Sequence, residues 1–341
     1  MKQKVFVLGA GASKPSGVPL MSELLEEALW KPYVNSVFGT SSNEIGDCDA
    51  VVDFLEKQFD QPLRPRQEGI YLSDSSLLCF CASHNAEELL TMIEAVSDPT
   101  GRADVFRAFT RLLFRALQPF GLNQKNNCYP NFSVQVEKSL REASVTIISF
   151  NYDTLLERAL LDLNRNLASS FSYLVPFHDR RHWNPYSESY IGNFELLKLH
   201  GSFNWATCRG CGSFTLCWFQ LFDNIGKTTC QKCGAVLLPL LVAPAASKHV
   251  QGVPWSSLWE RAVQCLSSCE ELTIIGYSLR DLQARDLFKD AMVSNPTVER
   301  ITVVDRNVEN LLAEFRELIG NPSTVKFDAF DSFEKYCGLN S

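Results

Sequence analysis

The stretch Val145-Thr146-Ile147-Ile148-Ser149-Phe150-Asn151-Tyr152-Asp153 decides the fold of this chain. Its first half is a β-branched apolar run, which predicts a buried strand, and residues 154–166 have the pattern of an amphipathic helix. In open α/β sheets, ligands bind at the carboxyl ends of the strands. We therefore expect Asn151 and Asp153 to lie at a ligand-binding edge of a parallel sheet.

Two other apolar runs end in similar turns. Residues 5–8 lead into Gly9-Ala10-Gly11-Ala12-Ser13, and residues 196–199 lead into His200-Gly201-Ser202. The glycines of the first turn permit a tight bend and the close approach of a pyrophosphate to backbone N–H groups. The dinucleotide fingerprint is incomplete, because Ser13 and Lys14 stand where it would continue, so an ordinary strand-to-helix turn is the alternative.

The final third of the chain alternates between strand and helix patterns. We expect strands at 271–275, 300–304 and 324–327, with helices at 281–292 and 308–319 between them. Such a β-α-β-α-β series indicates a doubly wound parallel sheet, which makes this an α/β protein. Asp305 directly follows the second of these strands, where its carboxylate can bind an adenosine ribose or cap the next helix.

The length of 341 residues is compatible with one α/β domain, residues 1–341, that carries inserted modules. Residues 21–140 have mostly helical patterns, including a capping box formed by Asn85 and Glu88. This segment is too long for a single crossover helix, so we expect an inserted helical subdomain. It can serve as a lid, hold a partner or be purely architectural.

The charge and hydropathy of the sequence exclude some classes of function. The formal net charge is -7 without a Lys/Arg-rich run, so the general electrostatic footprint of a nucleic-acid-binding protein is missing. No stretch of about 18 apolar residues can span a bilayer, and no apolar segment precedes a cleavage site near the start. We therefore expect a cytoplasmic protein that binds no membrane.

Four of the twelve cysteines have metal-ligand spacing. Cys208 and Cys211 form one C-x2-C pair, and Cys230 and Cys233 form a second pair 18 residues later. This spacing predicts four thiolates around one tetrahedral Zn²⁺ in a ribbon module at residues 204–238. Because sulfur fills every ligand position, the zinc is structural. We expect the other eight cysteines to be small, reduced residues.

Together these motifs resemble the sirtuin superfamily, and more closely its bacterial sirtuin-like branch than the protein deacylases. The resemblance covers most of the chain in separate islands. The matching positions are Gly-Ala-Gly-Ala-Ser at 9–13, Gly17 and Pro19, Asn-Tyr-Asp at 151–153, His200-Gly201, the four cysteines, and Gly-Tyr-Ser-Leu at 276–279.

The resemblance implies a Rossmann-like fold that binds NAD. It implies that His200 is a general base and that Asn151 holds the ribose or the attacking water, while Asp153 binds the ribose or orients a neighbour. The alternative for Asp153 is a helix cap, and for Asn151 a turn-forming residue. The positions expected to contact the nucleotide are Gly9, Ala10, Gly11, Ser13, Gly276, Ser278 and Asp305.

Three functions are compatible with these motifs. The first is NAD glycohydrolysis, which in similar bacterial proteins commonly depletes NAD in defence against phage. Control by an activating partner or by homo-oligomerisation is then expected. The second is protein-lysine deacylation, favoured by the four cysteines. Deacylating sirtuins have Asp-Phe-Arg after Gly-x-Pro, but this chain has Leu20-Met21-Ser22 there, which disfavours it. The third is a catalytically idle sensor of NAD or ADP-ribose.

Overall fold

The computed structural model describes residues 2–32, 42–64, 76–96, 99–117, 127–163, 171–179, 194–217, 228–242, 252–279, 281–319 and 324–339. The contacts divide the chain into two compact units. The sheet unit comprises Met1–Gly17, Gly121–Leu241 and Val250–Ser341, and the helical unit comprises Val18–Phe120 and Val242–His249.

The sheet unit contains a seven-stranded sheet in which all strand pairs are parallel. Its order is β11-β10-β9-β1-β2-β5-β3. Read from β5 to β11, with these six strands numbered along the chain and β3 left out, the order is 3-2-1-4-5-6. This is the doubly wound order of Rossmann folds, as predicted. The bounds are β1 Lys2–Leu8, β2 Ala143–Ser149, β3 Phe171–Ser172, β5 Phe194–Lys198, β9 Glu271–Ile275, β10 Arg300–Val304 and β11 Lys326–Phe330.

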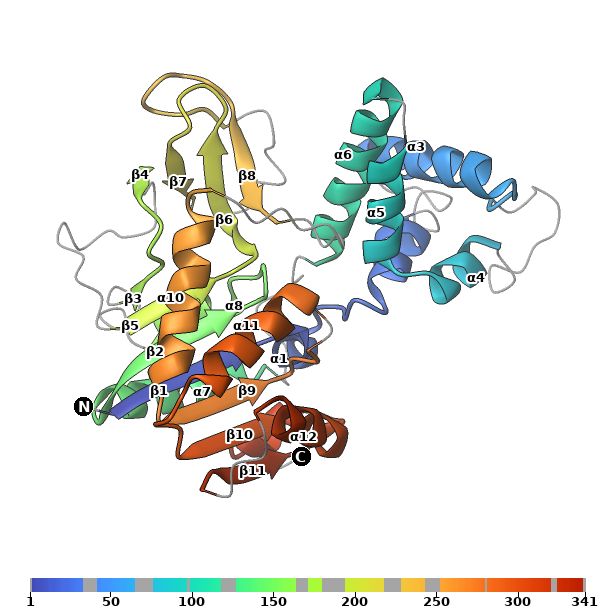
Figure 1. Ribbon diagram of the computed structural model, residues 1–341. Helices are drawn as coiled ribbons and strands as arrows, with labels where there is room; N and C mark the ends of the chain where they lie inside the picture. The colour runs from blue at the N-terminus through green and yellow to red at the C-terminus, as the bar shows by residue number, and fades with distance from the viewer. Residues whose placement is uncertain are drawn as a thin grey trace. The chain divides into compact units, whose positions relative to one another are not determined.

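Helices cover both faces of this sheet. Residues 5–8 of β1 point alternately to opposite faces, and all four are buried. In Figure 1, α10 and α11 lie in front of the sheet, and α10 contacts β1 and β5, whereas α7 packs against β2 and α8. The bounds are α1 Ala10–Ser13, the 3₁₀ turn η1 Lys14–Ser16, α7 Tyr129–Leu140, α8 Leu155–Leu163, α10 Trp255–Ser268, α11 Leu282–Val293, α12 Val308–Leu318 and α13 Phe333–Tyr336.

A second sheet follows His200 directly. It has four strands in the order β4-β7-β6-β8, and β6 pairs antiparallel with β7 and β8. Gly201 begins β6 with φ +84°, and a Cβ there would lie 2.3 Å from the Leu240 carbonyl oxygen, so only glycine fits this junction. The bounds are β4 Phe177–Asp179, β6 Gly201–Cys208, β7 Phe214–Leu216 and β8 Leu237–Leu241.

Within its described ranges, the helical unit contains a π-helical turn and four helices. Helix α3 packs against α6, as does α5, and Asn85 caps α5 by accepting a hydrogen bond from the Glu88 N–H at 2.8 Å. The segment predicted as a helical insertion, residues 21–140, also includes α7, which in the structure packs with β2 and α8 in the sheet unit. The bounds are η2 Glu26–Trp30, α3 Ser42–Phe59, α4 Ser76–Ser83, α5 Ala86–Ala95 and α6 Pro99–Ala116.

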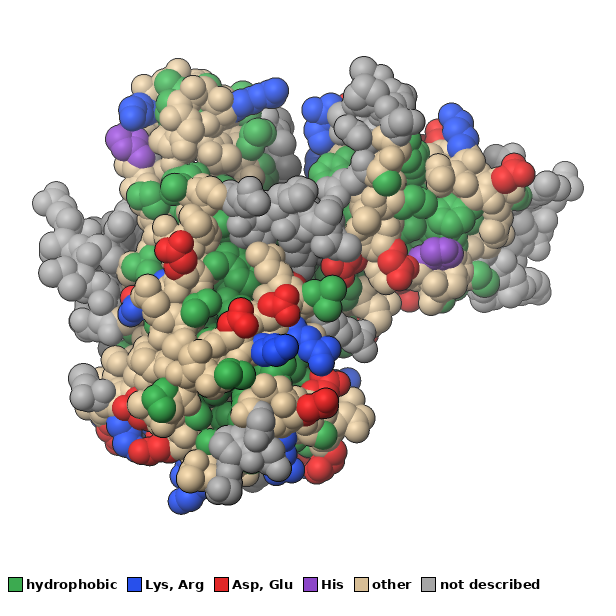
Figure 2. Space-filling view, in the orientation of Figure 1, with side chains coloured by type: hydrophobic (Ala, Val, Ile, Leu, Met, Phe, Trp, Pro, Cys, Tyr) green, Lys and Arg blue, Asp and Glu red, His purple; other side chains and the backbone are tan. Residues whose placement is uncertain are grey.

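The described residues contain no membrane-spanning helix, and the face shown in Figure 2 carries no basic patch. Among the helices of the described ranges, none has the length and apolarity needed to cross a bilayer. In Figure 2, the Lys and Arg side chains of the described residues are scattered, and several of them lie near Asp or Glu.

Candidate active site and metal centre

The register of the central sheet brings the predicted motifs to one edge. Lys198, Ser149, Leu8, Ile275 and Val304 are paired in register and form one row across β5, β2, β1, β9 and β10. The residue after each of them continues the ladder by a backbone hydrogen bond to the neighbouring strand, at 2.8–3.0 Å. The turns that contain Gly9, Asn151, His200, Gly276 and Asp305 therefore all begin at the same level. This level includes the switch point between β1 and β9, where such sheets bind ligands.

The two glycine turns at the switch point interlock. The Gly11 N–H donates to the Gly276 carbonyl oxygen at 2.9 Å. A Cβ at Gly9 would lie 2.4 Å from that same oxygen, and a Cβ at Gly276, whose φ is +60°, would lie 2.3 Å from the Ala12 nitrogen. The glycines are thus required for the packing of one turn on the other, and their contact with a pyrophosphate stays a prediction. Ala10 and Ser278 are exposed on these turns.

The Ser13 hydroxyl lies in a buried network. It donates to Asp153 Oδ2 at 2.7 Å and accepts from Asn151 Nδ2 at 3.0 Å. Its oxygen also lies 2.8 Å from the Tyr129 hydroxyl, which must be the donor because the Ser13 proton is already engaged. Burial and the charge of Asp153 raise the pKa of Tyr129 well above its usual range, so the phenol keeps its proton. Any contact of Ser13 with a ligand in this arrangement would come from its backbone.

Asn151 and Asp153 have different roles in this network. Asn151 Nδ2 also donates to the Gly9 carbonyl oxygen at 2.8 Å, so both amide hydrogens are engaged and Oδ1 is the part of the side chain that can accept from a ligand. Asp153 Oδ1 accepts from the Leu155 N–H at 3.1 Å, which is the capping interaction considered as the alternative. Asn151 therefore keeps only an acceptor oxygen for other partners, and its contact with a ligand stays a prediction, whereas Asp153 supports Ser13.

His200 is nearly buried, at 7% exposure, and is surrounded by aromatic rings. The Phe150 ring meets it edge-on with 5.3 Å between centroids, and the Tyr152 ring stacks on it at 6.0 Å. Its Nε2 atom lies 3.3 Å from Asp281 Oδ2. The sequence predicts Asp281 only as the start of a helix, and nothing local in it indicates that Asp281 reaches His200.

A buried ion pair supports the same region. Lys198 Nζ lies 3.0 Å from Glu157 Oε1, and the two side chains are 2% and 1% exposed. Lys198 also donates to the Asp153 carbonyl oxygen, and Glu157 accepts from the Tyr173 hydroxyl at 3.0 Å. These contacts join the strand before His200 to the turn after Asn151. A charged residue inside an apolar strand run was the signal that could have suggested Lys198.

Asp305 forms a local turn. Its Oδ1 atom accepts from the Asn307 N–H at 2.8 Å, immediately before α12. This is the alternative considered from the sequence, whereas a contact of Asp305 with a ribose stays a prediction.

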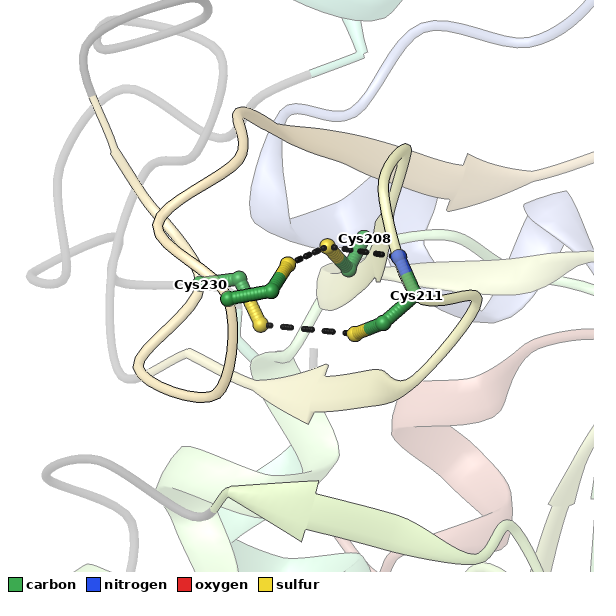
Figure 3. A group of neighbouring side chains, drawn as sticks. Cys208, Cys211 and Cys230 are labelled. Carbon is green, nitrogen blue, oxygen red and sulfur yellow. Dashed lines mark hydrogen bonds between the residues drawn. The ribbon is translucent and has the colours of Figure 1, made fainter.

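The four cysteines of the two C-x2-C pairs converge as predicted. Figure 3 shows Cys208, Cys211 and Cys230 directed toward one another from two turns. The Sγ atoms of Cys208 and Cys233 are 3.3 Å apart, those of Cys211 and Cys230 are 3.8 Å apart, and all four lie within 4.8 Å of one another. A tetrahedral site with Zn–S bonds of about 2.3 Å needs sulfur atoms about 3.8 Å apart. The group therefore fits one structural Zn²⁺.

The two turns that carry these thiols have equivalent geometry. The Gly212 N–H donates to the Cys208 carbonyl oxygen at 2.9 Å, and the Gly234 N–H donates to that of Cys230 at 2.8 Å. Both glycines have positive φ, 67° and 75°. At Gly210, a Cβ would lie 2.7 Å from that of Ala235, so the first knuckle needs a glycine there too.

The thiols also have the chemistry of metal ligands. Burial opposes ionisation of Cys230, but hydrogen bonds from Ser213 and from backbone N–H groups outweigh it and lower its pKa to about 6. A backbone hydrogen bond with Ala235 lowers the pKa of the neighbouring Cys233. Hydrogen bonds with the other thiols of the group, together with burial, outweigh this effect and raise that pKa to about 12. Four thiolates in this space need a cation to balance their charge.

No protein-family model matches the sequence, and no curated protein matches it. Solved structures similar to the chain include sirtuin structures. A Sir2 homologue in complex with NAD has 16% identity, a TM-score of 0.49 and coverage of 98% of this chain and 86% of that chain. Sir2Tm bound to a propionylated peptide has 14% identity, a TM-score of 0.41 and coverage of 99% and 94%. These structures belong to the family that the sequence motifs resemble.

Proposed function

We propose that this protein is an NAD glycohydrolase that releases nicotinamide and ADP-ribose. The observation that carries the proposal is the placement of Asn151 and His200 at the carboxyl edge of the sheet, beside the interlocked turns of Gly9 and Gly276. An amide acceptor and an imidazole at a Rossmann switch point suit a reaction at the ribose of a dinucleotide.

The proposed reaction replaces one bond to the ribose C1′ by another. The C1′–nitrogen bond breaks and its electron pair stays with nicotinamide, which leaves as a neutral molecule. A water oxygen bonds to C1′, and the proton that this water loses passes to a base and then to solvent. No acid is needed for the leaving group, so the protein has to hold the ribose and orient the water.

We assign these tasks to Asn151 and His200. Asn151 Oδ1 accepts a hydrogen bond from a ribose hydroxyl or from the water, because both Nδ2 hydrogens already bind Gly9 and Ser13. His200 takes the proton, since a neutral imidazole is a competent base near pH 7. Asp153 acts indirectly, through the Ser13 hydroxyl that holds Asn151.

The nucleotide-binding residues are the other part of the proposal. Ala10 and Ser278 are the exposed members of the two interlocked turns, and we infer that they contact the phosphates together with Gly9, Gly11 and Gly276. We infer that Asp305 binds the adenosine ribose through Oδ2, because Oδ1 accepts from the Asn307 N–H. The zinc of the four-cysteine group is structural and takes no part in the reaction.

Protein-lysine deacylation is the second candidate. The four-cysteine group favours it, because the deacylating sirtuins that the sequence resembles carry such a ribbon after His-Gly. The sequence Leu20-Met21-Ser22 in place of Asp-Phe-Arg disfavours it. A catalytically idle sensor of NAD or ADP-ribose is a third candidate, which the presence of both Asn151 and His200 disfavours.

We further propose, from the resemblance to bacterial sirtuin-like proteins, that NAD depletion by this protein serves defence against phage. Uncontrolled hydrolysis of NAD would harm the host, so an activating protein partner or homo-oligomerisation is expected to control it. The helical unit, which contains most of the predicted insertion, is the part we propose for this control.

The experiment is to incubate the purified protein with NAD, with and without an acetyl-lysine peptide, and to separate the products by chromatography. ADP-ribose formed without peptide supports the glycohydrolase, whereas O-acetyl-ADP-ribose formed only with peptide replaces it by the deacylase. His200→Ala and Asn151→Ala should each lower turnover by roughly 10²-fold or more. His178→Ala, which changes an exposed histidine on β4, is the matched control.

A further inference from the structure

Asp281 uses its two carboxylate oxygens for different partners. Its Oδ1 atom caps α11 by accepting from the N–H groups of Gln283 at 3.0 Å and Ala284 at 3.3 Å. Its Oδ2 atom lies 3.3 Å from His200 Nε2. The Asp281 and His200 side chains are only 13% and 9% exposed, so this contact is largely shielded from water.

The cap fixes the direction of the carboxylate. With Oδ1 held by two backbone N–H groups, the carboxylate cannot rotate freely, and Oδ2 is kept close to the imidazole, at ion-pair distance from Nε2 rather than in a hydrogen bond with it. Leu279, near the end of β9, is buried and has φ +53°, a left-handed conformation that is unfavourable for a non-glycine residue.

Capping alone does not require this residue to be charged. Asn, Ser and Asp cap helices about equally well, because one side-chain oxygen is sufficient. The second oxygen and the negative charge act on His200 instead. A carboxylate that faces one ring nitrogen fixes the orientation of the imidazole and stabilises the imidazolium that forms when the ring takes a proton.

On the basis of the proposed NAD hydrolysis, we propose that Asp281 is the positioning residue of His200. It holds the Nε2 side of the ring toward α11, so that the neutral imidazole carries its proton on Nε2 and its lone pair on Nδ1. It then balances the positive charge of His200 when the ring accepts the proton of the attacking water. The proton leaves to solvent after each turnover.

Variants of Asp281 separate this role from the cap. Asp281→Asn and Asp281→Ser keep a capping oxygen and remove the charge, so the unfolding temperature should stay close to that of the wild type. The value of kcat should fall at least about tenfold, within the roughly 10²–10⁴-fold that general base catalysis contributes, while KM changes little. Asp286→Asn removes an exposed carboxylate from the same helix and is the control that should keep full activity.

A double variant tests whether Asp281 acts through His200. If it does, His200→Ala with Asp281→Asn should be no less active than His200→Ala alone, because the residue that Asp281 positions is already gone. Additive losses would overturn the proposal, since they would mean a separate structural effect. Full activity of Asp281→Asn in an active wild-type background would also overturn it and would leave the proposed NAD hydrolysis intact.

A measurement without turnover distinguishes failure of this proposal from failure of the proposed function. Histidine-¹⁵N NMR reports the ring nitrogens of all five histidines, and the His200 signals are assigned by their loss in His200→Gln. They should shift in Asp281→Asn and stay in place in Asp286→Asn. Unchanged His200 signals in Asp281→Asn would overturn the positioning role, whether or not the protein hydrolyses NAD. A shift in a protein without NAD hydrolysis would support the contact and refute the glycohydrolase.

Discussion

Replacement of Lys198 by methionine tests the buried ion pair beneath the candidate active site. The methionine has nearly the same length, so the change removes the ammonium group without opening a large cavity. Glu157 would lose its partner at 3.0 Å while remaining 1% exposed, with the Tyr173 hydroxyl as its remaining donor. A buried charge left in this way costs about 3–5 kcal/mol of the free energy of unfolding.

The charge-balanced double variant sharpens the prediction. In Lys198→Met with Glu157→Gln, no buried charge is left, and the glutamine oxygen can still accept from Tyr173. The remaining cost is the Asp153 carbonyl oxygen that loses its donor, about 1–3 kcal/mol. The double variant should therefore be more stable than the Lys198→Met single variant, although it carries one more substitution.

The assay is urea unfolding followed by the fluorescence of tryptophans, to which Trp205, Trp255 and Trp259 of the sheet unit contribute. Lys335→Met removes one partner of an exposed pair with Asp331, 56% and 53% exposed, and should cost less than about 1 kcal/mol. If Lys198→Met costs no more than Lys335→Met, or if the two substitutions at Lys198 and Glu157 are additive, the reasoning about this pair is wrong.

Three other predictions follow from the structure. Elemental analysis should find one zinc per chain, and Cys208→Ser should lose it and destabilise the ribbon, whereas Cys79→Ser, at an exposed free cysteine, should retain it. In thermal unfolding, Gly276→Ala should be far more destabilising than Gly252→Ala. Both glycines have positive φ, but only at Gly276 would the new Cβ lie 2.3 Å from a backbone atom. Equal losses of stability would contradict the interlocking of the turns. Burial raises the pKa of the Cys269 thiol in the folded protein from 9.0 to about 12. Between these pH values the unfolded chain loses the thiol proton while the folded protein keeps it, so the stabilisation present below pH 9 is lost as the pH rises toward 12. Cys269→Ala should flatten the fall of the unfolding free energy over that range by up to about 1.4 kcal/mol per pH unit, and an unchanged slope would count against the assignment.

The local patterns of the sequence predicted most of the sheet unit. The apolar runs before Gly9, Asn151 and Gly276 became parallel strands because each is short, β-branched and bounded by turn residues. The four-cysteine group was predicted with equal success, because the spacing of C-x2-C pairs is itself a geometric constraint on one metal. The expectation that these turns share one edge also agreed with the structure, because it follows from parallel strand order.

The insertion boundary could not be predicted in the same way. The sequence between the first two strands has helical patterns throughout, and nothing local distinguishes a helix of the insertion from a helix that covers the sheet. Only packing separates α7, whose Phe132 ring lies 5.3 Å from Phe6 of β1, from the helices of the helical unit.

By itself, the sequence determined the α/β class, the sheet edge at which the candidate residues lie and the grouping of the four cysteines, since all three depend on contacts between near neighbours or on strand order. Only the tertiary structure decided which side chains support them. Tyr129 reaches Ser13 across 116 residues, and Asp281 reaches His200 across 81. A contact between such distant positions depends on how whole helices dock on the sheet, and this docking leaves no periodic trace in the amino-acid sequence.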